Sequence, residues 1–134
     1  MSVIYVQTTG TQTVGFGTSP TPIPGLSLTV PEGFGEQAFV TLNVPNPYSY
    51  TESTQYVAGG WFGLSVDGTT LPNVASFTFV RPSFQNVENL GRTPVTLVVA
   101  VALAAKPQTI VALWRSYGMW LRLDTPASLS AIIA

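Results

Sequence analysis

Hydrophobic and polar residues alternate along most of the chain with a period of two, which is typical of β-strands that bury one face. The 12 glycines and 11 prolines interrupt this alternation every few residues, as turns between short strands do. We therefore predict an all-β domain arranged as a β-sandwich. The predicted strands are Ile4–Gln7, Leu26–Val30, Ala38–Val44, Trp61–Val66, Ala75–Arg81, Val95–Ala104, Thr109–Arg115, Met119–Leu123 and Leu129–Ile133.

Three segments between the predicted strands each lead to a structural prediction. The segment from Thr8 to Gly25 is rich in Thr, Gly and Pro, and we expect it to cross one end of the sandwich. Asp67-Gly68 predicts a two-residue hairpin turn of type I′, because both central residues of that turn need positive φ. The segment from Pro82 to Gly91 is the most polar in the chain, which predicts an exposed loop that faces a ligand.

Two predicted strands look buried on both faces, because Leu97 to Ala105 and Ile110 to Trp114 are apolar without alternation. In a monomeric antiparallel sandwich one face of each strand meets water, so alternation should persist. A subunit interface would remove this discrepancy, and a loop that covers a central strand is the alternative. The low charge of the chain favours the interface, since obligate interfaces are apolar and poor in charge.

Length and charge narrow the class of protein. We expect the 134 residues to form one domain, residues 1–134. Charged residues make up 8% of the chain, the net charge is −1, and the five cations are scattered, so no basic patch for nucleic acid is predicted. The longest apolar run is nine residues, and a membrane span needs ~20, so no membrane insertion is expected. No classical signal peptide is present, which predicts synthesis in the cytoplasm and leaves later export to the cell surface open.

Most familiar catalytic groups are missing. Histidine and cysteine are absent, which removes the usual general base, metal ligand and covalent nucleophile. No Gly-x-Ser-x-Gly motif is present. The glycines of Gly59-Gly60 and Gly15-Phe16-Gly17 are predicted to be turn residues and not a phosphate-binding loop. The sequence therefore favours a binding protein without enzymatic activity or cofactor.

The acidic residues leave one enzymatic alternative open. A glycosidase needs only two carboxylates, for which Glu32, Glu36 and Glu52 are the candidates. Asp67 already has a turn role, and Asp124 follows the last basic residue. Solvated loop acids explain all of these residues more simply. No Asp-x-Asp or Asp-x-Asn cluster is present, so no metal site is predicted.

Aromatic and hydrogen-bonding residues in the predicted loops offer the remaining chemistry. A sugar presents C–H groups on one face and hydroxyls at its rim, so its site combines an aromatic surface with a donor fork such as guanidinium. One aromatic residue alone is more often part of a core, and only the group as a whole indicates a site. The group consists of Tyr48, Tyr50, Tyr56, Trp61, Asn89, Arg92, Trp114, Arg115 and Tyr117.

Four sequence segments carry a resemblance to a known family. They are Leu42-Asn43-Val44-Pro45-Asn46-Pro47-Tyr48, Phe77-Thr78-Phe79, Gly91-Arg92-Thr93-Pro94-Val95-Thr96-Leu97-Val98 and Asp124-Thr125-Pro126-Ala127-Ser128-Leu129-Ser130-Ala131-Ile132. In these segments the chain resembles the small fucose-binding bacterial lectin domains with a tumour-necrosis-factor-like fold, which form the N-terminal half of certain superlectins. The resemblance implies a jelly-roll sandwich, a tight homotrimer, and metal-free fucoside sites between neighbouring protomers.

The same resemblance implies which residues bind the sugar. One protomer is expected to contribute Tyr48, Asn89 and Arg92. The neighbouring protomer is expected to contribute Trp61, Thr78, Phe79 and, near the family's second arginine, Arg115 and Tyr117. The aligned position of that arginine is nearest to Tyr117, so its guanidinium comes from Arg115 or is absent. Trp61 and Phe79 replace tyrosines of the family and lack their hydroxyls, so fucose is the leading candidate among sugars.

Two functions follow as hypotheses. The first is a lectin for terminal L-fucose in oligosaccharides of cell surfaces. The alternative is a structural or adhesive jelly-roll trimer, such as a fibre or capsid-like module, with no sugar site. The set of Tyr48, Asn89, Arg92 and Trp61 discriminates between them, because assembly does not require it.

Overall fold

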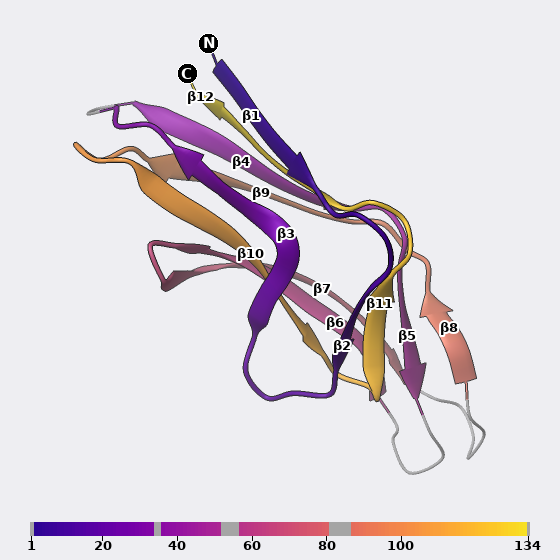
Figure 1. Cartoon of the computed structure of the whole chain (residues 1–134). Helices are drawn as coiled ribbons and strands as arrows, with labels where there is room; N and C mark the ends of the chain where they lie inside the picture. Colours follow the sequence, from indigo (N-terminus) through magenta and orange to yellow (C-terminus); the bar gives the residue numbers. More distant parts are fainter. Residues whose placement is uncertain (1, 34–35, 52–56, 81–86, 134) are drawn as a thin grey trace.

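The computed structural model describes residues 2–33, 36–51, 57–80 and 87–133. For residues 51, 57, 79–80 and 87–91 it describes the backbone only. All regular secondary structure in these ranges is β-strand (Figure 1). The strands are β1 (Ser2–Gln7), β2 (Gln12–Gly15), β3 (Thr21–Val30), β4 (Gln37–Val44), β5 (Pro47–Thr51), β6 (Val57–Val66), β7 (Thr69–Val80), β8 (Val87–Gly91), β9 (Val95–Ala102), β10 (Gln108–Ser116), β11 (Trp120–Leu123) and β12 (Ser128–Ile133). The predicted all-β jelly-roll sandwich is confirmed.

The sandwich has two layers, and one of them is broken. The continuous layer is the antiparallel sheet β3-β10-β6-β7. The broken layer consists of an upper sheet, β1-β12-β4-β9, and a lower sheet, β2-β11-β5-β8 (Figure 1). Each upper strand is joined along the chain to the lower strand at the same place in the order: β1 to β2, β12 to β11, β4 to β5 and β9 to β8. The two sheets are therefore one four-stranded layer interrupted along a line.

Prolines explain where this layer breaks. Pro45 separates β4 from β5, Pro94 separates β8 from β9, and Pro126 separates β11 from β12. Proline has no N–H to donate to a β-ladder, so three prolines at one level interrupt the pairing there. The buried residue Thr8, which follows β1, is hydrogen-bonded to Ala127 at the level of the break. The Thr8 Oγ1 accepts a 2.9 Å hydrogen bond from the Ala127 N–H, and the Thr8 backbone N–H donates to the Ala127 carbonyl at 2.9 Å.

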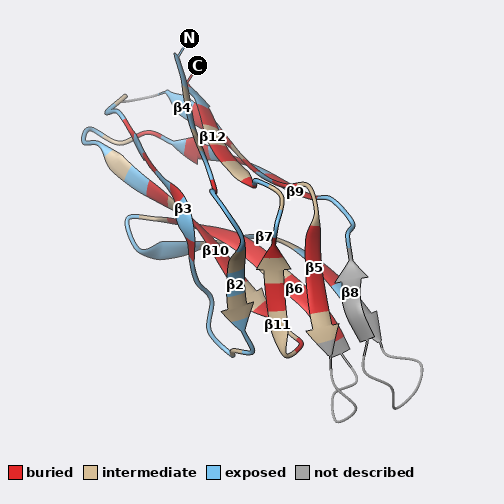
Figure 2. Cartoon of the chain, turned by 45° about the vertical axis from the view of Figure 1, so that its right-hand side comes forward, coloured by how far each residue is buried: buried red, intermediate tan, exposed pale blue. Residues whose placement is uncertain are grey.

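The core lies between the layers and follows from strict alternation. In β9 every second residue is buried, and β4 shows the same pattern up to its end. Buried residues occur in the strands of both layers (Figure 2). The largest fully buried side chains of the core include Trp114, Phe62, Ile23, Leu26, Leu42, Leu64, Ile110, Leu121, Leu123 and Leu129. The core therefore continues from the upper sheet through the break into the lower one.

Every predicted strand corresponds to an observed strand, but three short strands were not predicted: β2, β5 and β8. Thr8 to Gly25 is not simply a crossing loop, because it contains β2 and the start of β3. Pro82 to Gly91 is not simply a loop either, because Val87–Gly91 is strand β8; residues 82–86 lie outside the described part. The three missed strands, together with β11, form the lower sheet.

The predicted hairpin turn is confirmed. Asp67 and Gly68 have φ values of 49° and 84°, as a type I′ turn needs, and they join β6 to β7. The Asp67 carboxylate also accepts a 2.9 Å hydrogen bond from the Thr109 N–H, which ties the turn to the start of β10.

The prediction that Gly59 and Gly60 are turn residues is wrong, because both lie inside β6. Gly59 has φ 125°, and a Cβ there would overlap the backbone carbonyl of Phe77 on the neighbouring strand. A Cβ on Gly60 would lie 2.5 Å from a Leu121 methyl carbon. These glycines allow β6 to pass close to β7 and to the lower sheet.

The two strands predicted to be buried on both faces differ from each other. Strand β9 lies at the edge of the upper sheet, and its outer residues are exposed, with Val98 at 59%. Strand β10 is central, and its outward Leu113 is buried. The indole of Trp61 lies over Gly63, the residue paired with Leu113, so a bulky side chain of the neighbouring strand lies beside this position.

We predict that Gly59→Ala destabilises the fold by about 3 kcal/mol, because the new methyl group meets backbone that cannot rotate away. Gly68→Ala is the matched control, since it has positive φ but open space, and should cost only about 1 kcal/mol. Denaturant unfolding of both variants measures the difference. Equal destabilisation would show that close packing of β6 on β7 is not what requires glycine.

Candidate functional site

The first set of predicted site residues lies on and beside the lower sheet. Tyr48 is in β5, where it pairs with Gly91 on one side and Arg122 on the other. Asn89 is in β8, with its side chain outside the described part, and Arg92 follows the last residue of β8. Adjacent strands thus bring Tyr48 and Arg92 together, although they are far apart in the sequence.

Arg92 has a strained backbone. Its φ is 57°, which is uncommon for a residue with a Cβ, and its N–H donates to the Pro47 carbonyl at 2.7 Å. A left-handed conformation costs roughly 1–2 kcal/mol at such a residue. The conformation places the guanidinium carbon 3.8 Å from the centroid of the Tyr48 ring, in a cation–π contact. Strain of this kind is typical of functional positions.

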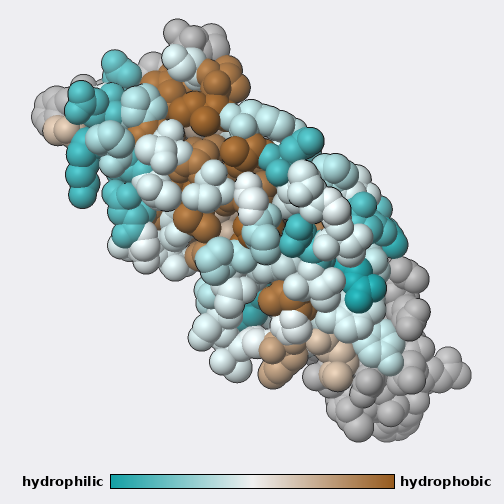
Figure 3. All heavy atoms as spheres, in the orientation of Figure 1, coloured by the Kyte–Doolittle hydropathy of each residue, from teal (hydrophilic) through white to brown (hydrophobic). Residues whose placement is uncertain are grey.

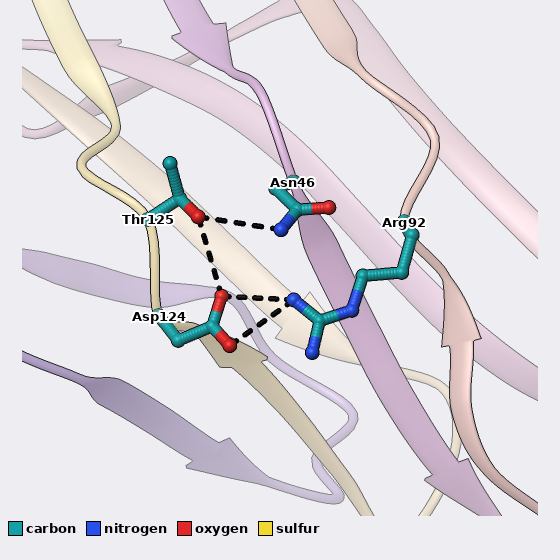
Figure 4. Close-up of polar contacts among 4 residues, drawn as sticks. All are labelled: Asn46, Arg92, Asp124 and Thr125. Carbon is teal, nitrogen blue, oxygen red and sulfur yellow. Dashed lines mark hydrogen bonds and ion pairs between the residues drawn. The ribbon is translucent and has the colours of Figure 1, made fainter.

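The guanidinium is also held by a carboxylate at the break in the layer (Figure 4). One Arg92 Nη donates to both Asp124 oxygens, at 2.9 and 3.1 Å. The Thr125 hydroxyl donates to Asp124 at 3.4 Å and accepts from the Asn46 amide at 3.3 Å. The hydrogen bond from Arg92 holds the pKa of Asp124 below its ordinary value, and the positive charge of Arg92 acts in the same direction. Asp124 is therefore ionised at neutral pH.

Arg92 and Asp124 form a polar surface beside the Tyr48 ring, and this surface can both donate and accept hydrogen bonds. Guanidinium nitrogens only donate and carboxylate oxygens only accept, whereas a sugar hydroxyl does both. Arg92 and Asp124 are about one-third exposed, so water reaches both side chains. The pair can bind neighbouring hydroxyl groups of a ring, whereas the Tyr48 ring is 7% exposed and is covered by Arg92.

The lower sheet also carries aromatic residues that the sequence analysis missed or left unassigned. The Trp120 ring lies at right angles to Tyr48, with centroids 5.5 Å apart, and stacks on Tyr50 at 5.4 Å. The guanidinium carbon of Arg122 lies 4.2 Å from the Trp120 ring. The alternation of Trp120, Leu121, Arg122 and Leu123 in β11 was the available signal, because it places Trp120 and Arg122 on the face opposite the core.

The second set of predicted site residues lies on the continuous layer. Trp61 in β6 is paired with Arg115 in β10, and the Arg115 guanidinium carbon is 5.0 Å from the Tyr117 ring. Arg115 donates to the Thr18 carbonyl at 3.1 Å, while its buried Nε has no hydrogen-bond partner in the described part of the chain. Thr78 in β7 is exposed. Phe79 follows it in β7, and its side chain lies outside the description.

The two sets face away from each other in one chain. Trp61 alternates with the core residue Phe62, so it points out of the continuous layer. Tyr48 is paired with Arg122, which alternates with the core residues of β11, so it points out of the lower sheet. The sandwich therefore lies between the sets, and facing sheets alone are about 10 Å apart. One sugar ring cannot contact both sets of the same chain.

Other candidates from the sequence have different places. Trp114 is 2% exposed and belongs to the core, so it is not a sugar platform. Asp124 is not a free loop acid, because it is paired with Arg92. Tyr56 and Glu52 lie outside the described residues. Within the described ranges there is no cluster of three or more acidic, histidine or cysteine residues suited to a metal ion, no pocket, and no helix able to cross a membrane.

Comparison with known proteins identifies the family. A family model described as the N-terminal domain of Bc2l-C matches residues 4–132. The chain belongs to the Bc2l-C N-terminal domain family. The resemblance noted in the sequence is thereby confirmed, and the family is one of lectin-type domains and not of enzymes. Among curated proteins, no sequence matches the chain.

We predict a small, acid-sensitive contribution of the Arg92–Asp124 pair to stability. The pKa of Asp124 is lower in the folded state than its ordinary 3.8, so the contribution is fully present above about pH 4 and is lost as the pH falls through the folded-state pKa. Because the pair is partly exposed, we expect about 1 kcal/mol or less. Urea unfolding of wild type and Asp124→Asn at pH 7 and pH 3 measures it. The gap between the two proteins should be smaller at pH 3 than at pH 7, and a gap of equal size at both values would contradict the assignment.

Proposed function

We propose that this protein is a non-catalytic, metal-free lectin that binds terminal L-fucose in oligosaccharides, at sites formed between the protomers of a homotrimer. Each site is weak, because a solvated sugar buries little apolar area and its hydroxyls already bond to water. Three sites that engage one fucosylated cell surface together raise the avidity.

The observation that carries this proposal is the strained Arg92, stacked on Tyr48 and paired with Asp124. Arg92 lies outside the hydrophobic core, and its left-handed conformation is uncommon for a residue with a Cβ. A guanidinium beside a carboxylate does match neighbouring hydroxyl groups on the rim of a deoxyhexose. Arg92 then donates to sugar hydroxyls, and Tyr48 and Asn89 add contacts from the same protomer.

The second set of residues supports a site shared by two copies of the chain. Trp61, Thr78, Arg115 and Tyr117 point out of the opposite layer and cannot reach a ligand on Arg92 of their own chain. In a closed ring of protomers, the outer face of one lower sheet meets a different surface of the next copy. Trp61 of that copy would cover the apolar side of the sugar.

A surface suited to self-association supports the trimer. Strands β1, β12, β4 and β9 contain no charged residue. The outer face of this upper sheet carries Val3, Tyr5, Phe39, Val98 and Ile132, between 41% and 63% exposed. Hydrophobic residues gather over the upper half of the molecule, where this sheet lies (Figure 3). An exposed apolar face without charge is typical of an obligate interface.

This apolar face would also serve a purely structural trimer, which is the alternative function. The alternative gives no role to the strained Arg92 or to its partners on Tyr48 and Asp124. Replacement of Arg92 therefore distinguishes the lectin from the structural trimer.

We predict that Arg92→Gly abolishes glycan binding but leaves the fold intact. Glycine adopts φ 57° without cost, so relief of strain offsets the loss of the exposed ion pair, and stability should change by less than about 1 kcal/mol. Loss of charged hydrogen bonds to the sugar should weaken binding about a hundredfold. A glycan array with fucosylated, mannosylated and galactosylated sets, followed by titration with the best ligand, measures both effects.

Lys106→Gln is the control for this experiment, because it removes one positive charge from an exposed loop between β9 and β10. It should bind like wild type. An Arg92→Gly protein with normal binding would overturn the site, and a wild-type array with no signal would favour the structural alternative. Signal on another sugar would keep the site and change the ligand.

A separate prediction concerns assembly. Val98→Glu places a charge on the apolar face and should weaken self-association about a hundredfold or more, because a buried unpaired charge is costly. Thr29→Glu is the matched control, since it introduces the same charge at an exposed strand position on the continuous layer. Sedimentation velocity distinguishes trimer from monomer. A trimeric Val98→Glu protein would exclude the upper sheet as the interface.

A further inference from the structure

Arg122 stands out among the cations described on the lower sheet because no carboxylate neutralises it. Arg92 on the same face is paired with Asp124, whereas Arg122 has no ion pair with any described residue. Its Nε donates to the Thr13 hydroxyl at 3.1 Å, and its guanidinium carbon lies 4.2 Å from the centroid of the Trp120 ring. Among described residues, its two Nη atoms have no hydrogen-bond partner.

The position of Arg122 relative to Arg92 links the two. Both guanidinium carbons lie against the same Tyr48 ring, at 3.8 Å for Arg92 and 6.0 Å for Arg122. Trp120 and Tyr50 continue the aromatic surface from there along β11 and β5. A saccharide bound at Arg92 therefore has half-buried aromatic rings beside it, and the positively charged guanidinium of Arg122 lies next to these rings.

We infer that Trp120, Tyr50 and Arg122 form a second subsite, which binds a sugar residue bearing a carboxylate or a sulfate next to the terminal sugar. This inference rests on the proposed function. The planar guanidinium fork matches the paired oxygens of both anions. Stacking on Trp120 and the bond to Thr13 fix the fork before the ligand arrives, which lowers the entropy lost on binding. Trp120 and Tyr50 are half-buried, so their exposed parts border the same sugar residue.

The test compares three forms of one fucosylated oligosaccharide: the neutral form, a sialylated form that adds a carboxylate, and a sulfated form. Wild type should bind at least one anionic form about three- to tenfold more tightly than the neutral form, and this preference should shrink as salt is added. A preference for one of the two anionic forms identifies which anion the fork accepts.

Two variants locate the preference. Arg122→Gln keeps hydrogen-bond donors but removes the charge, so it should bind all three forms with the affinity that wild type shows for the neutral form. Thr13→Val removes the acceptor of the Nε bond and should reduce the preference in part. Lys106→Gln removes an equal charge elsewhere and should keep the full preference. Sedimentation and thermal unfolding establish that each variant remains folded and assembled.

The contradicting outcomes are distinct. Equal affinity of wild type for all three forms would overturn the second subsite and leave the lectin function standing. Absence of binding to every fucosylated form would overturn the proposed function itself. If Arg122→Gln lost the neutral ligand or the trimer, Arg122 would belong to the primary site or to the interface, and the inference would be wrong.

Discussion

The break in one layer of the sandwich is the constraint on which the rest of the structure depends. Pro45, Pro94 and Pro126 interrupt three strands at one level, so a single sheet becomes an upper and a lower sheet. At this level the chain leaves regular pairing, and Arg92 and Asp124 meet there. The same feature that ends the ladder therefore exposes a polar pair beside an aromatic strand. The continuous layer behind it supplies the rigid support that a preorganised site needs.

The break also divides the molecule into two kinds of surface. Above it, four strands without a charged residue present apolar side chains to solvent. Below it, the outer face carries aromatic rings and two guanidinium groups. A protein that assembles through the first surface and binds through the second keeps its ligand groups out of the apolar interface. Arg115 and Trp61 lie on the opposite layer, so they could contact a ligand on a lower sheet only if that sheet belonged to a second copy of the chain, as we propose.

The sequence predicted the long strands and the fold family well. In β4 apolar residues recur at every second position, whereas β9 was predicted from a continuous apolar run, and its alternation shows only in the burial of its residues. The sequence did not predict β2, β5 and β8, whose four or five residues lie among Pro, Gly and Thr and are too short for a period to register. Tyr48 and Arg92 were found through the family resemblance. Asp124 was read as a solvated acid and Arg122 was not considered, because their roles depend on pairing between distant strands.

The central claim is that each sugar site is completed by a second copy of the chain, and complementation between two defective variants tests it most directly. Arg92→Gly removes the guanidinium beside the lower sheet. Arg115→Met removes the positive charge on the continuous layer but keeps an apolar side chain of similar length. Each variant alone should form trimers that do not bind fucosylated glycans. When the two are unfolded together and refolded as a mixture, about a quarter of the sites should combine intact halves and regain binding. A mixture as inactive as its components, with mixed trimers shown by mass spectrometry, would contradict the shared site.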